Sequence, residues 1–320
     1  MSVLVAQIWE KFHDLPLARG SAAVNAVQCT IKNTHLLIKG QDGEPVLLVH
    51  ALPRVCPRTP IRLKHLSITF DLTCEVHDSS AGLITGTFTR FSCSPASANL
   101  HKYFIDIIIA ATLCEGEPAQ ESMVDEQVSA ILELFRQFSA PPRTTVVGLW
   151  GELLTIFASD KVESFVRGWH NELSEAFDFS FEGVRLEVKA TEKRIREHDF
   201  SLRQVESARP GDFVVSILVS RNASGYTVFD LLDEICVKLP FELSEKIIRI
   251  ALETLGEDSE LADGHRFELS SAVQSICFLR ADKVPSPTID SALSDFISNV
   301  RFQSNISLAC RQFGSSNYPS

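Results

Sequence analysis

The chain has 320 residues, 45% of them hydrophobic and 22% charged, and its formal net charge is −11 at pH 7. This composition is ordinary for a globular protein and excludes wholesale disorder, and the length is sufficient for two domains of about 100–200 residues each. The most apolar stretch, 103–113, contains Asp106 and is shorter than the roughly 20 residues that span a bilayer. The N-terminus shows neither a basic leader nor a small-residue cleavage site, so we expect a soluble, cytoplasmic protein.

Eight cysteines are scattered along the chain without a CxxC pair or a tight Cys/His cluster. This spacing argues against a zinc finger or ribbon. Cys236 and Cys277 stand among apolar residues, as EICV and SICFL, and we expect buried, reduced thiols there. The phosphate-binding patterns GxxxxGK[ST] and GxGxxG are absent, which removes support for a metabolic enzyme with such a loop.

Residues 1–142 predict a β-rich domain with two helices. Strand patterns occur at 28–32, 34–39, 46–51, 61–77 and 83–91, and helical periodicity follows at 98–113 and 122–138. Ser122 is the expected N-cap of the second helix, since Asp125 follows three residues later. The prolines of SAPPR end that helix, so we place the domain boundary at about 140–143. This first domain could bind DNA or a partner protein, and both alternatives stay open.

Residues 143–320 predict a second domain that mixes helices and strands. Helices are expected at 146–158, about 161–169, about 199–207, 228–239, 244–255 and near 290–297. A β-hairpin is expected at about 176–190, a central buried strand (FVVSILV) at 213–219, and strand-like stretches at 267–279 and 300–308. The hairpin is the most informative of these elements.

The hairpin segment AFDFSFEGVRLEVKA, residues 176–190, alternates apolar and polar side chains without exception. Glu182-Gly183 is a natural two-residue turn, because glycine supplies the positive φ that such turns require. A turn at this position places Asp178 directly opposite Glu187, and the alternation puts both acids on the same face as Lys189. The register therefore gathers two carboxylates and one ammonium group on one side of the ribbon.

Opposed carboxylates on a hairpin repel each other and are destabilising. A divalent cation would turn this repulsion into attraction, because Mg²⁺ prefers hard oxygen ligands, and Lys189 could stabilise the negative charge that grows on a phosphate oxygen. The alternative is that these residues form only the solvent face of an amphipathic hairpin, since a short pattern of this kind also arises by chance. The metal site is favoured because the chain contains no other (D/E)-x-K.

The preceding helix offers a third acid, Glu152, which is the only charge in the apolar run VVGLWGELLTIF. Glu152 is either a surface residue of a mostly buried helix or an outer carboxylate that points at the polar face of the sheet. Gly148 and Gly151 would let this helix approach the sheet closely. Trp150 and Trp169 are expected in the core rather than as stacking platforms for bases.

The segment after the hairpin is locally basic, with seven Lys/Arg against five Asp/Glu between Arg185 and Arg209. It forms either an ordinary solvated face or a patch that contacts nucleic acid without sequence preference. A helix capped by Asp199 or Ser201 would let Gln204 reach back to the site. The candidate nucleic-acid contacts are Arg194, Arg196, His198 and Arg203.

The ordered strings GLWGELL, GWH, FDF, LEVKAT and HDFSLRQ resemble the bacterial "PD-(D/E)XK motif protein" family, a branch of the restriction-endonuclease-like superfamily, over about residues 146–206. The resemblance implies an α+β or α/β fold whose αβββαβ core has a mixed central sheet, with a helical and stranded extension at its C-terminal side. One departure is that Phe177, rather than proline, precedes the first hairpin acid. The implied catalytic residues are Glu152, Asp178, Glu187, Lys189 and Gln204.

The same resemblance implies a metal ion held by Asp178, Glu187, Glu152 and the main-chain carbonyl of Val188. The expected ion is Mg²⁺, with Mn²⁺ as a substitute, and the expected reaction is phosphodiester hydrolysis in which Lys189 positions and activates the attacking water. The chain would act as a DNA endonuclease subunit of a bacterial restriction or anti-phage defence system, with other proteins of its operon and a possible homodimer as partners and no membrane association. The alternative is a catalytically silent scaffold subunit that keeps the nuclease fold.

Overall fold

A computed structural model of the protein describes residues 2–18, 24–28, 35–51, 58–78, 82–113, 121–170, 177–181, 183–206, 208–289 and 299–318. The chain divides into two compact units, Met1–Pro142 and Arg143–Ser320, and each is described by itself. Within the described residues, no helix combines the length and apolar character needed to cross a membrane.

The first unit is built on a six-stranded sheet in the order β1-β2-β3-β6-β5-β4. Strand β1 also pairs with β5 in parallel, whereas all the other neighbours are antiparallel. The sheet therefore closes on itself. Its strands are β1 (Val24–Gln28), β2 (His35–Lys39), β3 (Pro45–His50), β4 (Ile61–Arg62), β5 (Leu66–Asp78) and β6 (Gly82–Cys93).

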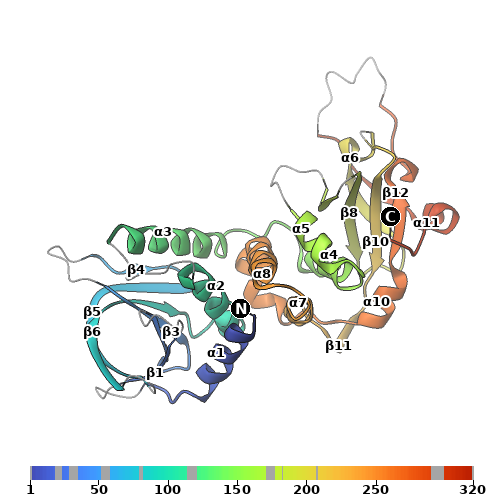
Figure 1. Cartoon of the computed structure of the whole chain (residues 1–320). Coiled ribbons are helices and arrows are strands. Elements are labelled where there is room, and N and C mark those ends of the chain that lie inside the picture. Colours follow the sequence, from blue (N-terminus) through green and yellow to red (C-terminus); the bar gives the residue numbers. More distant parts are fainter. Residues whose placement is uncertain are drawn as a thin grey trace. The chain divides into compact units, whose positions relative to one another are not determined.

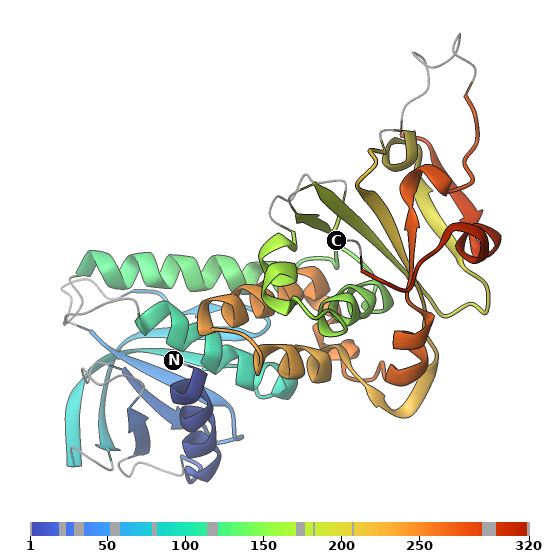
Figure 2. The ribbon, with the colours of Figure 1, turned by 45° about the vertical axis from the view of Figure 1, so that its right-hand side comes forward.

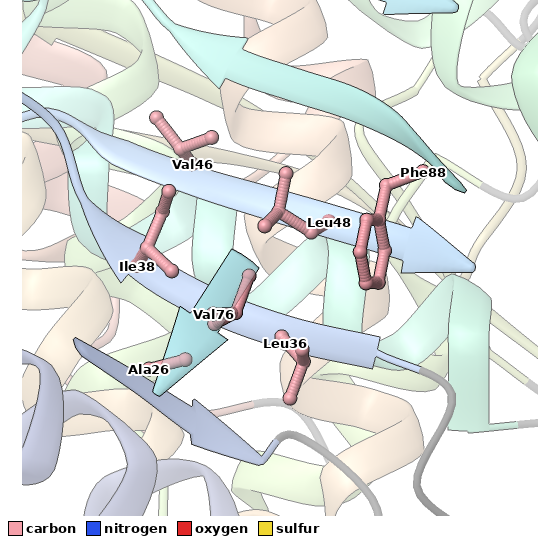
Figure 3. Packing of buried hydrophobic residues seen from close by; sticks show 7 residues of the cluster. All are labelled: Ala26, Leu36, Ile38, Val46, Leu48, Val76 and Phe88. Carbon is pink, nitrogen blue, oxygen red and sulfur yellow. The ribbon is translucent and has the colours of Figure 1, made fainter. Parts of the chain in front are cut away.

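The hydrophobic core of this sheet forms where alternate side chains of five strands meet. Strands β2 and β3 each contribute two residues two positions apart, because side chains on the same face of a strand recur with a period of two. Figure 3 shows these side chains gathered between the strands. The cluster consists of Ala26, Leu36, Ile38, Val46, Leu48, Val76 and Phe88.

Three longer helices and one short turn accompany this sheet: α1 (Ser2–Asp14), η1 (Ala98–Leu100), α2 (His101–Leu113) and α3 (Glu121–Gln137). Figure 1 shows α1, α2 and α3 in the same unit as the sheet. Helix α1 was not predicted. The predicted cap at Ser122 is wrong, since the helix already includes Glu121.

The second unit contains a four-stranded sheet in the order β12-β10-β8-β7, in which β8, β10 and β12 run side by side (Figure 1). Its strands are β7 (Phe179–Phe181), β8 (Val184–Thr191), β10 (Asp212–Leu218) and β12 (Cys277–Arg280). Strand β10 is parallel to β8 and antiparallel to β12, and β7 is antiparallel to β8. The sheet is therefore mixed, and the apolar run predicted as its central strand is β10.

Helix α4 (Val146–Phe157) packs on β8 and is itself flanked by α5 (Val162–Gly168), α7 (Val228–Cys236) and α8 (Phe241–Leu255). Figure 2 shows α4 next to the sheet, with α7 and α8 farther from it. The close approach depends on Gly151, because a Cβ atom there would lie 2.7 Å from the Cβ of Ala190. Gly148 does not serve this purpose, since its missing Cβ would meet Thr144 rather than the sheet.

Strand β9 (Glu197–Ser201) pairs with β13 (Arg301–Asn305) and leads into the short helix α6 (Leu202–Glu206). An apolar cluster that includes Phe200, Val214, Leu279 and Ile306 joins these elements to the sheet. The helix predicted at 199–207 is therefore wrong in its first residues, which pair as a strand. The other elements of this unit are β11 (Arg221–Tyr226), η2 (Gly256–Asp258), α9 (Ser259–Ala262), α10 (Leu269–Ser275), η3 (Ala281–Lys283) and α11 (Ser307–Phe313).

Two further stretches on the C-terminal side of the second unit differ from the sequence prediction. The stretch 267–279, predicted as strand, contains α10 before β12 begins at Cys277. The stretch 300–308 is strand only as far as Asn305, and α11 follows from Ser307. The helix predicted near 290–297 lies outside the described residues.

The contact between α4 and β8 makes a testable prediction for Gly151→Ala. The added methyl group would lie 2.7 Å from the Cβ of Ala190 on β8, so we expect a loss of about 1–3 kcal/mol in the free energy of unfolding through overpacking. The matched control is Gly148→Ala, whose methyl group would meet the side chains of Thr144 and Thr145 before the helix, with the Thr144 hydroxyl nearest, and not the sheet. This control should be neutral or gain up to about 1 kcal/mol from helix propensity. Equal urea-unfolding midpoints for the two variants would contradict the packing.

Candidate metal centre

The hairpin forms with the predicted pairing of Phe179 with Leu186 and of Phe181 with Val184, and Gly183 has a φ of +80° in the turn. Strand β7 begins only at Phe179, so Asp178 lies one position beyond the paired residues, where the register of the hairpin leads to Glu187.

Asp178 is held by the neighbouring strand. Its Oδ2 accepts a hydrogen bond of 2.7 Å from the backbone N–H of Val188. This contact anchors the acid to β8 and satisfies a backbone donor that the hairpin ladder leaves unpaired.

Helix α4 carries Glu152 into the interior, where only 5% of the residue is exposed. Its Oε2 accepts a hydrogen bond of 2.8 Å from the indole Nε1 of Trp169 and lies 2.8 Å from the Nε2 of His170. A buried carboxylate needs such partners, because an unsatisfied charge in a protein interior is strongly unfavourable. Trp169 is thus a core residue, as predicted, and also fixes a site acid.

His170 is a site residue that the sequence analysis did not single out, although it belongs to the string GWH. Its backbone lies in the left-handed region, with a φ of +44°, and its N–H donates a 3.0 Å hydrogen bond to the carbonyl of Asp178. Strained backbone of this kind concentrates at functional sites. One ligand atom each from Glu152, His170 and Asp178 lie within 4.8 Å of one another, so these three side chains could hold a metal ion together.

Glu187 and Lys189 form an ion pair beside this group, with 2.6 Å between Glu187 Oε1 and Lys189 Nζ. Burial lowers the pKa of the Lys189 ammonium, but the neighbouring Glu187, Asp178 and Glu152 outweigh this effect and raise the pKa above its ordinary value. The sequence left the charge state of Lys189 open, and this environment keeps the side chain protonated.

Gln204 supports the ion pair from α6, since its side chain hydrogen-bonds to Glu187. Its Oε1 also accepts the N–H of Ser201 at 3.0 Å, and its own N–H approaches the Ser201 Oγ at 3.4 Å. These reciprocal bonds form a capping box. Ser201 is therefore the cap of this helix, and the bond to Glu187 places Gln204 beside the ion pair.

The centre holds more negative than positive charge. Burial raises the pKa of the Asp178 carboxyl well above its usual range, and Glu187 and Glu152 raise it further. Burial likewise raises the pKa of Glu187, although Lys189 and Gln204 oppose the change. Carboxylates crowded in this way favour a divalent cation, so the chemistry of the donor set fits a metal ion.

The four predicted nucleic-acid contacts separate into two groups. Arg194 and Arg203 are exposed, so their contact with nucleic acid stays a prediction. Arg196 donates hydrogen bonds to the carbonyls of Ser216 and Ser275, and His198 is 4% exposed with its Nε2 2.7 Å from the Ser216 hydroxyl. These bonds tie Arg196 and His198 to β10 and α10, and a phosphate contact of either side chain stays a prediction.

The crowding of acids makes a prediction for Asp178→Asn. Because the pKa of Asp178 is raised in the folded state, the ionised carboxylate lowers stability at neutral pH. Without metal, this variant should therefore have a free energy of unfolding about 0.5–2 kcal/mol higher than that of the wild type. Added Mn²⁺ should then stabilise the wild type by mass action but leave the variant unchanged. Thermal unfolding at pH 7.5 measures both effects, with the exposed Asp199→Asn as the control. A variant less stable than the wild type in metal-free buffer would contradict the account.

The burial of His198 makes a prediction about acid. Burial and the positive charges of Lys189, Arg196 and Lys193 lower the pKa of His198 to about 3, so below pH 6.5 the unfolded chain binds a proton that the folded chain does not. As the pH is lowered below 6.5, the free energy of unfolding should therefore decrease by up to about 1.4 kcal/mol per pH unit. His198→Gln should remove this component in urea titrations between pH 7 and 4.5. Parallel curves for wild type and variant would exclude a buried neutral histidine.

Comparisons with known proteins agree with the sequence resemblance. The chain matches the family described as "Putative PD-(D/E)XK family member, (DUF4420)" over residues 7–307. Neither the curated proteins nor the solved structures contain a match. Families of the PD-(D/E)XK kind generally use divalent metal ions, which accords with the acidic group described above. Since the match covers nearly the whole sequence, this chain belongs to the PD-(D/E)XK family DUF4420.

Proposed function

We propose that the second unit is a metal-dependent nuclease that hydrolyses phosphodiester bonds of DNA. The observation that carries this proposal is the convergence of Glu152, Asp178 and His170 within 4.8 Å, next to a lysine whose pKa is raised. A divalent cation and a fixed positive charge are the two groups that phosphodiester hydrolysis needs, since negative charge builds up on the phosphate in the transition state.

The chain order of the second unit supports an αβββαβ core. Helix α4 would be the first helix, and the bridge of Trp169 to Phe179 would mark a minimal first strand. Strands β7 and β8 would carry the acids and the lysine. Helix α6 and strand β10 would complete the core, with β10 parallel to β8.

Asp178 and Glu152 would hold the metal ion through carboxylate oxygens, with His170 as a nitrogen ligand. The proposed ion is Mg²⁺, and Mn²⁺ should substitute well because it accepts imidazole more readily than Mg²⁺ does. When bound, the ion would polarise the scissile phosphate and lower the pKa of a water molecule. A ligand role for Glu187 and for the carbonyl of Val188 stays a prediction, since Glu187 is engaged by Lys189.

The residues of the chain supply the remaining functions. Protonated Lys189 is suited to stabilise the growing charge on a phosphate oxygen and to orient the attacking water by donating a hydrogen bond. It is poorly suited to remove a proton from that water, because its neighbours raise its pKa. Glu187 fixes the position of the ammonium group at 2.6 Å, and Gln204 fixes Glu187 in turn.

The proposed setting is bacterial defence against foreign DNA, in the cytoplasm, with partner proteins of the same operon and a possible homodimer. The formal net charge of −11 supports dependence on a partner, because phosphate contacts need local positive charge. The second candidate function is a catalytically silent scaffold with the nuclease fold. It is favoured by one observation, namely that Glu187 stands outside the group of side chains that could share an ion.

Plasmid cleavage tests the proposed activity. With Mg²⁺ or Mn²⁺ present, Lys189→Ala and Asp178→Asn should each lose at least about 100-fold in rate, as expected for removal of a group that stabilises transition-state charge. The matched control is Lys193→Ala, since Lys193 is an exposed lysine paired with Glu197 outside the centre.

The two candidate functions give different outcomes in this assay. Cleavage that disappears in both site variants but survives in Lys193→Ala identifies a nuclease. If the wild type, supplied with its partner proteins, cuts nothing while Asp178→Asn still supports defence in cells, the chain acts as the scaffold instead.

A further inference from the structure

The second unit contains a cavity of about 410 Å³ whose lining includes none of the residues of the metal centre. Its volume lies in the range of small-molecule binding sites. It forms where β10 ends at Leu218 and β12 begins at Cys277, which is the carboxyl end of the parallel pair β8 and β10. Ligands of open α/β sheets bind preferentially at that end. We call it the arginine pocket; its lining includes Arg194, Arg196, Arg311, Cys277, Cys310 and Ser307.

Three arginines line the pocket, and no lining residue carries a carboxylate. Arg194 and Arg311 are exposed, and within the described part of the chain neither forms an ion pair or a hydrogen bond through its side chain. Three guanidinium groups around one cavity repel each other. In a chain with a net charge of −11, such a cluster needs an explanation other than general basicity.

Arg196 adds a fixed charge to the wall. Its guanidinium donates hydrogen bonds to the Ser216 carbonyl at 2.7 Å and to the Ser275 carbonyl at 2.5 Å, and both acceptors are neutral. The positive charge is therefore oriented but not compensated. The neighbouring thiol of Cys277 has a pKa lowered to about 7 in spite of burial. A hydrogen bond from Cys310 is the main cause, and the positive charge of Arg196 contributes to a smaller extent.

We infer that the arginine pocket binds a phosphate group. Guanidinium forks match the oxygens of phosphate in pairs, and an anion would turn the repulsion among Arg194, Arg196 and Arg311 into attraction. The phosphate could belong to a free nucleotide or to the backbone of a DNA strand. The inference goes beyond the proposed nuclease function and does not depend on it.

The sheet register relates the pocket to the metal centre. Lys189 pairs with Ser216, and Ser216 pairs with Cys277, so the three side chains share one face. Since neighbouring strands lie about 4.8 Å apart, the Cα atoms of Lys189 and Cys277 are separated by about 10 Å. A DNA strand bound at the metal centre would therefore pass close to the pocket, so a backbone phosphate is a reasonable source beside a free nucleotide.

Titration calorimetry in EDTA tests the inference, because removal of divalent ions separates it from the metal centre. The probes are adenosine monophosphate, for a free nucleotide, and a ten-nucleotide single-stranded DNA, for a backbone phosphate. The double variant Arg194→Gln/Arg311→Gln changes two exposed side chains and should fold normally. It should bind at least one probe about 10- to 100-fold more weakly than the wild type, as expected for the loss of two charge-assisted contacts. Arg301→Gln, at an exposed arginine outside the pocket, is the control for the loss of a surface arginine.

Each outcome of this titration is decisive. A loss confined to the mononucleotide identifies a free-ligand site, and a loss confined to the oligonucleotide identifies a backbone site. Absence of binding by the wild type to both probes overturns the inference, as does equal binding by the double variant and Arg301→Gln. None of these results depends on whether the chain cleaves DNA.

Thiol alkylation then locates the bound probe. Under saturating probe, iodoacetamide should label Cys277 and Cys310 several-fold more slowly, because an occupant covers the pocket and neutralises the arginines that favour the thiolate. Cys236 is half-buried, does not line the pocket, and should react at an unchanged rate. Binding that leaves all three rates unchanged would place the probe elsewhere and contradict the assignment.

Discussion

Three carboxylates and one lysine share a buried region of the second unit, and this excess of negative charge constrains everything around it. Burial and mutual repulsion raise the pKa values of Asp178 and Glu187. A fold tolerates such crowding when the acids are held rigidly and when bound protons or a cation offset their charge. The contacts of Trp169, His170 and Val188 hold the acids in place. Carboxylate and imidazole groups so close together are ligands that suit a divalent cation.

Each acid is held by a different device. Gly151 lets α4 approach β8, which carries Glu152 close to the hairpin. Trp169 fixes one oxygen of Glu152. The left-handed backbone of His170 turns its ring toward the same oxygen while its N–H binds the carbonyl of Asp178. These contacts link the helix, the bend before β7 and strand β8 into one unit, so the centre is positioned by the fold and not by a flexible loop.

Much of this arrangement could be predicted because it follows from local periodicity. The strict alternation of 176–190 gave the hairpin register, and the glycine turn followed from its φ requirement. His170 could not be found in this way, since a positive φ at a non-glycine residue depends on tertiary contacts. The position of Asp178 outside β7 has a similar cause, because its carboxylate takes over a backbone donor of β8.

The strand at 197–201 pairs with residues about a hundred positions away, and a local sequence pattern cannot predict such a pairing. Helix α1 and the folding of 267–279 as a helix before β12 likewise depend on packing.

The most direct test of the central claim is to locate a divalent ion. Crystals of the wild type soaked in Mn²⁺ should show an anomalous diffraction peak bound by carboxylate oxygens of Asp178 and Glu152 at about 2.0–2.3 Å, the usual range for such ligands, with His170 alongside. The same soak of an Asp178→Asn crystal should show no peak there. A wild-type crystal that binds Mn²⁺ only elsewhere, with the three acids still grouped around Lys189, would contradict the claim that this cluster exists to hold a metal ion.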